Sequence, residues 1–394
     1  MPKAVPDFRI SPSFALVAAA CARPATLDRD ATITRAVAAG VDWDEVVALA
    51  ERHRVEGLVF DGLVCAGVAL PPAAARILSE RALDVARRSL AAAAESVRLQ
   101  GALDAAGVPN LVLKGAALER LAYDRLGLKS AWDIDVLVSL DGAARARAVL
   151  EAAGYALTSP DDPSPEAFAQ WTALSKECVF TSGDGRTMVE LHWALVEGDL
   201  LPGLSTASPT QTVQIASGLA VRTLDHDELI AYLMVHGAAH GWSRLKWLAD
   251  LNALLAKGDR QEIERVFRRA VELGAGTCPA LALRLCRRLF GLSVPPSLAL
   301  EIDRDVKAGL LERVALDAMA GAGARELADR LFAEDRILVS RLLFDHGWPY
   351  RRREFRRQWV SIHDRTHLSL PAQLDFVYDI VRAPLWIWRR LRRP

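Results

Sequence analysis

Residues 133–138 read Asp-Ile-Asp-Val-Leu-Val, and this stretch decides how the middle of the chain is expected to fold. Polar and apolar residues alternate at its start, and its last three residues are all apolar. That pattern is typical of a β-strand that begins at an open cleft and runs into a buried core. Because successive side chains of a strand point to opposite faces, we expect Asp133 and Asp135 on one face and Ile134 on the other.

The two aspartates predict a cation site. Carboxylates roughly 7 Å apart along one face of a strand repel each other unless a positive charge lies between them. Glu190 occurs in a second alternating run, residues 188–192, and adjacent strands would bring all three carboxylates together. Mg²⁺ prefers carboxylate, phosphate and water oxygens, and such a trio suffices for one ion or for two ions about 4 Å apart. The competing interpretation is a solvated strand face, which is the commoner setting for a D-x-D pattern.

A phosphate seat is expected just upstream. The apolar run 111–113 predicts a strand, Lys114-Gly115 follows it, and residues 116–123 have helical spacing. The N-terminus of a helix favours a bound phosphate, glycine permits close backbone approach, and Lys114 adds a positive charge.

Around this centre the sequence predicts an α+β protein, in which a small mixed sheet is flanked by helical lobes. Residues 1–106 and 226–394 have helical periodicity, and the second of these regions ends in a basic tail. Residues 107–225 form the expected α/β core, in which Ser182-Gly183-Asp184-Gly185 predicts a hairpin turn between strands 177–181 and 187–193. Asp42 is a candidate cap for a helix over 43–50, and Pro71-Pro72 opens one or two helices over 73–103.

Composition narrows the class of protein. The chain has 394 residues, of which 51% are hydrophobic and 25% charged, and its formal net charge is zero. It therefore has no overall field that would attract nucleic acid. Its five cysteines form no CxxC pair, which argues against a disulfide framework or a zinc site and favours a reducing, cytoplasmic setting. No apolar run reaches the ~18 residues of a membrane-spanning helix, and no signature of a P-loop, Rossmann or serine-hydrolase site occurs.

Three histidines are further candidates. His236 and His240 lie four residues apart on an expected helix, a spacing that suits Zn²⁺, although the HExxH pattern is absent. We favour packing beneath the site or contact with a phosphate or acceptor. His192 shares a strand face with Glu190, so it either orients Glu190 or a metal-bound water, or packs in the core. Lys246 is either a ligand of a triphosphate or a solvated lysine.

Several motifs together resemble a bacterial family of uncharacterised nucleotidyltransferases within the DNA polymerase beta-like superfamily. The resemblance extends to about residue 255 and rests on residues 50–55, 113–118, 133–138, 154–155, 190–193, 227–229, 236–242 and 245–250. It implies that Asp133, Asp135 and Glu190 bind Mg²⁺, and that Gly115 contacts the phosphates of a nucleoside triphosphate donor. It also implies transfer of a nucleotidyl group to an acceptor, which is an unidentified small molecule, peptide or sugar, with release of pyrophosphate.

Three positions depart from the family pattern. Ala116 follows Gly115 where relatives have serine, Lys129 stands where they often have arginine, and Trp132 replaces a small residue. Ala116 and Lys129 remain candidate contacts of the bound nucleotide. These departures keep two alternatives open: a catalytically inactive binding module, and an enzyme that uses a nucleotide donor to modify a peptide or sugar in a biosynthetic pathway. The basic tail, residues 341–394, is either a set of solvated arginines or a contact surface for a membrane or polyanion.

Overall fold

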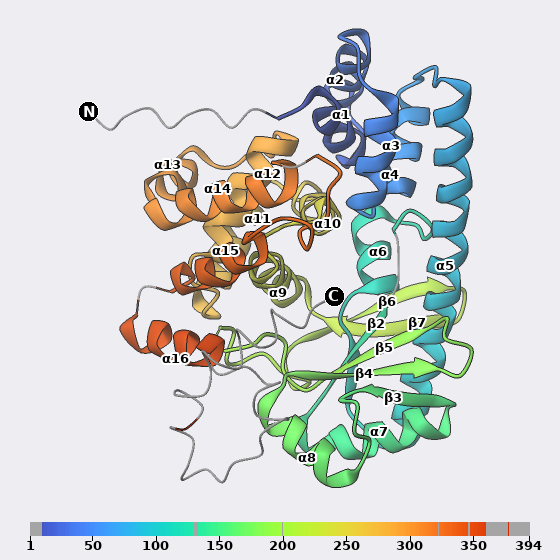
Figure 1. Cartoon of the computed structure of the whole chain (residues 1–394), viewed down its shortest axis with the longest axis vertical. Coiled ribbons are helices and arrows are strands. Elements are labelled where there is room, and N and C mark those ends of the chain that lie inside the picture. The colour runs from blue at the N-terminus through green and yellow to red at the C-terminus, as the bar shows by residue number, and fades with distance from the viewer. Residues whose placement is uncertain are drawn as a thin grey trace.

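The computed structural model describes residues 10–129, 133–198, 200–321, 323–345, 347–359 and 377. Trp132 and most of the basic tail, including the arginines of 389–393, lie outside the described residues. Within them the protein is an α+β structure with a five-stranded mixed sheet, a separate two-stranded sheet and helices on either side in sequence (Figure 1). Among these described segments, no helix has the length and apolar character that crossing a membrane requires.

The N-terminal region is helical, as predicted. Its helices are α1 (Pro12–Cys21), α2 (Leu27–Ala38), α3 (Trp43–Arg52), α4 (Glu56–Cys65) and α5 (Pro72–Ala105). The Asp42 side chain accepts hydrogen bonds from the backbone N–H groups of Asp44 and Glu45, which confirms it as the cap of α3. Helix α5 is one uninterrupted helix of 34 residues that runs from the N-terminal helices to the sheet.

The main sheet has the strand order β1-β2-β5-β4-β3. Its strands are β1 (Asn110–Val112), β2 (Asp133–Val138), β3 (Tyr155–Ser159), β4 (Glu177–Ser182) and β5 (Met188–His192). Strands β2 and β5 run parallel and the other neighbours run antiparallel. The connecting helices are α6 (Gly115–Tyr123), η1 (Leu140–Gly142), α7 (Ala143–Ala152) and α8 (Pro165–Leu174). The two strands that bear Asp135 and Glu190 are therefore neighbours, which is the condition under which their carboxylates come together.

A hairpin of β6 (Thr210–Ala216) and β7 (Leu219–Leu224) forms the second sheet and lies against β1 and α6. Helices then return: α9 (His226–Ala239), α10 (Leu245–Leu255), α11 (Arg260–Glu272), α12 (Cys278–Phe290), α13 (Pro296–Arg304), α14 (Val306–Ala320), α15 (Ala333–Ser340), η2 (Arg341–Leu343) and α16 (Trp348–Trp359). Neither this hairpin nor β3 was predicted from the sequence.

Two main clusters of buried side chains hold these layers together. The larger one joins residues of α1, α3 and α4, such as Leu16, Leu49 and Leu63, to residues of α9, α10, α12 and α14. The second cluster fills the space between the sheet, α5 and α7, and contains Leu99, Val136 and Leu191. The strand edge that bears the acidic residues faces α9 and α10 of the first cluster, so the site lies where the sheet and the C-terminal helices meet.

Candidate functional site

The acidic residues of β2 and β5 lie side by side. In the parallel register Asp135 stands opposite Glu190, and alternation puts Asp133 on the same face of β2 as Asp135. Burial rises along β2 from the half-buried Asp133 to apolar residues that are wholly enclosed, as the sequence pattern predicts. Asp135 is 2% exposed, whereas the Glu190 side chain is 25% exposed toward a cavity that both residues line.

His192 connects three carboxylates on this face. Its Nε2 lies 3.2 Å from Asp135 Oδ1 and 3.5 Å from Glu190 Oε2. Its Nδ1 lies 2.9 Å from Glu177 Oε2, because β4 places Glu177 opposite His192. The two atoms form an ion pair and are not aligned as a hydrogen bond. Burial alone would lower the pKa of His192, but contacts with Asp135, Glu177 and Glu190 raise it to about 9. The site therefore surrounds one imidazole with negative charge.

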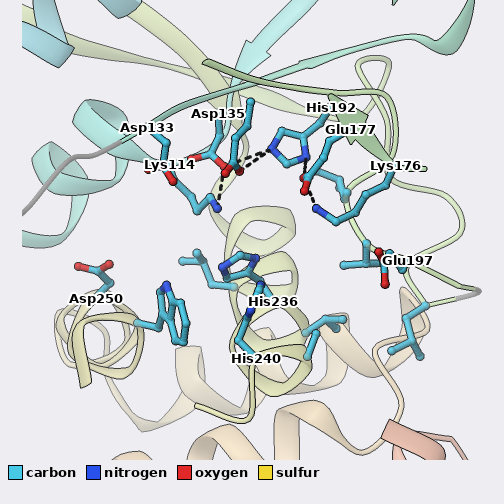
Figure 2. Close-up of a pocket in the computed structure, with 18 of the residues that line it drawn as sticks. Lys114, Asp133, Asp135, Lys176, Glu177, His192, Glu197, His236, His240 and Asp250 are labelled. Atoms are coloured by element: carbon cyan, nitrogen blue, oxygen red, sulfur yellow. Dashed lines mark hydrogen bonds and ion pairs between the residues drawn. The ribbon is translucent and has the colours of Figure 1, made fainter. Parts of the chain in front are cut away.

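Lys114 supplies a positive charge to the same face. It follows β1, precedes α6 at its N-terminus, and places Nζ 2.7 Å from Asp135 Oδ1 (Figure 2). Burial opposes both charges, but their attraction outweighs it, so the pKa of Lys114 is raised and that of Asp135 is held well below its usual range. In this arrangement Lys114 performs part of the neutralisation that a divalent cation would provide.

The donor set fits a divalent cation. Ligand atoms of Asp135, Glu190 and His192 all lie within 4.8 Å of one another, and this close group does not include Asp133. Two carboxylates and an imidazole are ligands that divalent metals accept. Asp133 lines the same cavity.

The predicted phosphate seat also opens onto this cavity. Gly115 begins α6 with φ +59°, and a Cβ atom built there would meet no neighbour within 4 Å. Ala116 is 2% exposed and packs in the interior. Lys129 lines the cavity, and its Nζ lies 3.0 Å from Asp250 Oδ2. The structure thus brings Lys114, Gly115 and Lys129 to one wall and turns Ala116 away from it.

An aromatic wall lies across the cavity from the acidic face (Figure 2). The ring centroids of His236 on α9 and of His240, which directly follows α9, are 4.6 Å apart, and that of His240 is 5.0 Å from Trp247 on α10. Desolvation in the cavity and the nearby Lys114 charge lower the pKa of His236 well below its usual range and that of His240 to about 3. Both imidazoles are therefore neutral, and the wall presents π faces to a ligand.

Lys246 is a buried residue that lines the same cavity. It is 9% exposed, and among the residues that the structure describes its ammonium has no ion-pair partner. Its Nζ lies 5.8 Å from the centroid of the Trp247 ring. Desolvation and repulsion from Lys129 lower its pKa to about 8.

Sequence reasoning missed several residues of the cavity, which are Arg54, Lys176, Glu177, Glu197, Arg341 and Arg357. Glu177 begins a predicted strand, so alternation could have assigned its side chain to one of the two faces of that strand. Only the β4–β5 register shows that Glu177 meets His192. Arg341 donates to the carbonyl of Ala239, and this contact joins residues that are about a hundred positions apart. No local pattern in the sequence signals such a pair.

Comparison with known proteins identifies the family. The family described as "Uncharacterised nucleotidyltransferase" matches residues 39–291, a span that contains the acidic face, the phosphate seat and the aromatic wall. No curated protein matches the sequence. Because the family match covers well over half of the chain, this protein belongs to that nucleotidyltransferase family.

Proposed function

We propose that the protein transfers a nucleotidyl group from a nucleoside triphosphate to an acceptor and releases pyrophosphate, with Asp133, Asp135 and Glu190 as ligands of a divalent metal. The observation that carries this proposal is the pairing of Asp135 with Glu190 across β2 and β5, at a cavity that is also lined by Lys246, which has no ion-pair partner among the described residues. Negative ligands for a metal and positive ligands for phosphates thus face one space, as transfer of a phosphorus group requires.

The donor would lie between the two walls of the cavity. Gly115 and the N-terminus of α6 receive phosphate oxygens through backbone N–H groups. Lys246 and Lys129 add positive charge, and the rings of His236, His240 and Trp247 offer a surface on which a base can stack. A bound divalent ion would neutralise charge on the triphosphate and polarise its reacting phosphorus.

Glu190 is the better placed of the carboxylates to accept the acceptor's proton. Its side chain is 25% exposed, whereas that of Asp135 is 2% exposed and is paired with Lys114. The acceptor oxygen forms a bond to the α-phosphorus as its proton passes to Glu190, and the bond from the α-phosphorus to pyrophosphate breaks. The acceptor is a hydroxyl or phosphate of a small molecule, peptide or sugar.

The first test is a calorimetric and thermal-shift screen of the four nucleoside triphosphates and UDP-sugars, with and without Mg²⁺. We expect one donor to bind in a metal-dependent way, and Asp135→Asn to weaken that binding by at least about 10-fold. Asp141→Asn is the matched control, because Asp141 is an exposed aspartate just after β2 that does not line the cavity. Equal binding to wild type and Asp135→Asn would refute the assigned site.

The same screen addresses the alternative of an inactive binding module. That alternative predicts metal-dependent binding with no pyrophosphate release in any acceptor mixture. Pyrophosphate release that depends on one class of acceptor would identify the reaction and exclude this alternative.

A further inference from the structure

We infer that His192 is itself a metal ligand, and that the ion held with Asp135 and Glu190 is a first-row transition-metal ion of the Mn²⁺ type in preference to Mg²⁺. The inference deepens the proposed function and rests on it. It adds an imidazole to the carboxylates of the proposed site.

Distances around the imidazole suit a shared ion. His192 Nε2 is 3.2 Å from Asp135 Oδ1 and 3.5 Å from Glu190 Oε2, and the residue is 1% exposed. Ligand atoms that bind one ion at about 2.1 Å lie roughly 3 Å apart or slightly more. Asp133, the residue expected to complete a carboxylate trio, does not belong to the close group.

The other ring nitrogen determines which atom faces the ion. Nδ1 lies 2.9 Å from Glu177 Oε2, and an ionised carboxylate can only accept a hydrogen bond. Nδ1 faces the negative charge of Glu177, and when Nδ1 carries the single hydrogen of the neutral ring, Nε2 keeps the lone pair that binds a metal. Lys176 pairs with Glu177 and favours its ionised form. A carboxylate behind a ligating histidine is the usual way in which proteins orient such a ring.

This donor set determines the choice of metal. Mg²⁺ is bound through oxygen and keeps several waters, whereas imidazole ligands favour transition-metal ions. Mn²⁺ accepts both carboxylate and imidazole, and it performs the same charge neutralisation in phosphorus-group transfer. A histidine that served only as a counter-ion for three carboxylates would leave no imidazole nitrogen bound to the ion.

The test uses Mn²⁺ alone and Mg²⁺ alone with the full chain. We expect wild type to bind Mn²⁺ at least about 10-fold more tightly than Mg²⁺, and the electron spin-echo of bound Mn²⁺ to show modulation from an imidazole ¹⁴N. In His192→Gln the modulation should disappear, and Mn²⁺ affinity should fall by about 10- to 100-fold or more, with a smaller change for Mg²⁺. His236→Gln is the matched control, since His236 lines the same cavity, and the modulation should persist in it.

Mn²⁺ that binds wild type without ¹⁴N modulation, or modulation that survives in His192→Gln, would overturn the inference and leave the proposed function standing. Failure of wild type to bind either ion would overturn the metal-dependent function as well. The wild-type spectrum decides the first point without a variant, so the test holds even if His192→Gln does not fold. If His192→Gln does not fold, the double variant His236→Gln/His240→Gln identifies the nitrogen. Modulation that survives in this double variant assigns the nitrogen to His192, and loss of the modulation refutes the inference.

Discussion

At the scale of single residues, Lys246 is the most informative group of the cavity. A buried ammonium without an ion-pair partner among the described residues lowers stability, because burial penalises its charge. Such a group is useful when an anionic ligand completes the pairing. We therefore interpret Lys246 as a binding residue for the triphosphate, placed at a cost to the stability of the free protein.

Replacing this lysine should separate stability from binding. In Lys246→Met we expect the free energy of unfolding to rise by about 1–3 kcal/mol at pH 7 and nucleotide affinity to fall by about 10-fold. Chemical unfolding and calorimetry measure the two quantities. Lys257→Met is the control, because Lys257 is 37% exposed and pairs with Asp124. A variant that loses stability and keeps its affinity would show that Lys246 has only a structural role.

The pH dependence follows from the pKa of Lys246, which is lowered to about 8 in the free protein by desolvation and then by repulsion from Lys129. Arg54 and Lys114 also repel it, and Asp133 attracts it. The charged form binds phosphate, so wild-type affinity for the triphosphate should be nearly constant below about pH 7 and fall as the pH rises through about 8. The destabilisation is fully present below about pH 8 and fades as the pH rises further. Calorimetry between pH 7 and 9.5 should give a flatter profile for Lys246→Met, and identical profiles would contradict the assignment.

Only part of the site can be predicted from single residues. Strand alternation and a strand-to-helix junction are local features, and they made six residues of the cavity predictable from the sequence. These residues are Asp133, Asp135, Glu190, His192, Lys114 and Gly115. Glu177 and Arg341 depend on strand register and on long-range helix packing, so no local pattern predicts them. The roles assigned to all these residues remain predictions.

At the scale of secondary-structure elements, α6 fixes the loop that leads from the phosphate seat toward β2. Glu119 of α6 is 1% exposed and accepts hydrogen bonds from the backbone N–H groups of Leu128 and Lys129, at 2.6 Å and 2.7 Å. In Glu119→Ala two buried N–H groups lose their acceptor, so we expect a loss of about 2–4 kcal/mol in the free energy of unfolding and weaker nucleotide binding. Glu119→Gln keeps one oxygen acceptor and should lose less. Urea unfolding measures both, and equal stabilities of the two variants would contradict this role.

The close packing at the C-terminal end of α9, beside His236 and His240, requires a glycine at position 237. A Cβ atom on Gly237 would lie 2.4 Å from the ring of Trp242, which is wholly buried just beyond the end of α9. We expect Gly237→Ala to destabilise the protein by about 1–3 kcal/mol through overpacking. Gly101→Ala in α5 is the matched control: no atom lies within 4 Å of its Cβ, so it should stabilise by about 0.5–1 kcal/mol. Thermal and urea unfolding compare the two, and changes of the same sign would refute the close-packing argument.

Prediction of the elements succeeded where periodicity was strong and failed for strands β3, β6 and β7. The helices on both sides and strands β1, β2, β4 and β5 were expected, because long apolar stripes and alternating runs mark them. Strand β3 follows Gly154 directly, and Tyr155 is its only buried residue, so its hydrophobic alternation is weak. In the β6–β7 hairpin, only Val213 of β6 is buried, and β7 buries Val221, Thr223 and Leu224 near its end. Strands that bury few apolar side chains show only a weak hydrophobic pattern in the sequence.

At the scale of the whole molecule, the N-terminal and C-terminal helices share one core. Arg52 of α3 donates hydrogen bonds to the carbonyls of Ala318, Met319 and Arg325, at 2.7 Å, 3.1 Å and 2.7 Å. The larger hydrophobic cluster likewise joins α1 and α4 to α9, α10 and α12. The division into lobes at residues 106 and 225 remains a prediction, but the shared core implies that the two helical regions depend on each other for stability.

We therefore expect residues 1–106 expressed alone not to unfold cooperatively, since the C-terminal partners of Leu16, Leu49 and Leu63 are missing.

In the full chain, Arg52→Leu leaves at least three buried carbonyls without a donor and should lower the free energy of unfolding by about 3–5 kcal/mol. Because both helical regions share the core, near-UV and far-UV signals should shift together in one transition. Arg35→Leu on the exposed side of α2 is the control and should change stability by less than about 0.5 kcal/mol. A stable 1–106 fragment, or a separate transition for the N-terminal helices in Arg52→Leu, would show that the helical regions are independent and that the cavity between sheet and helices does not rely on α1–α4.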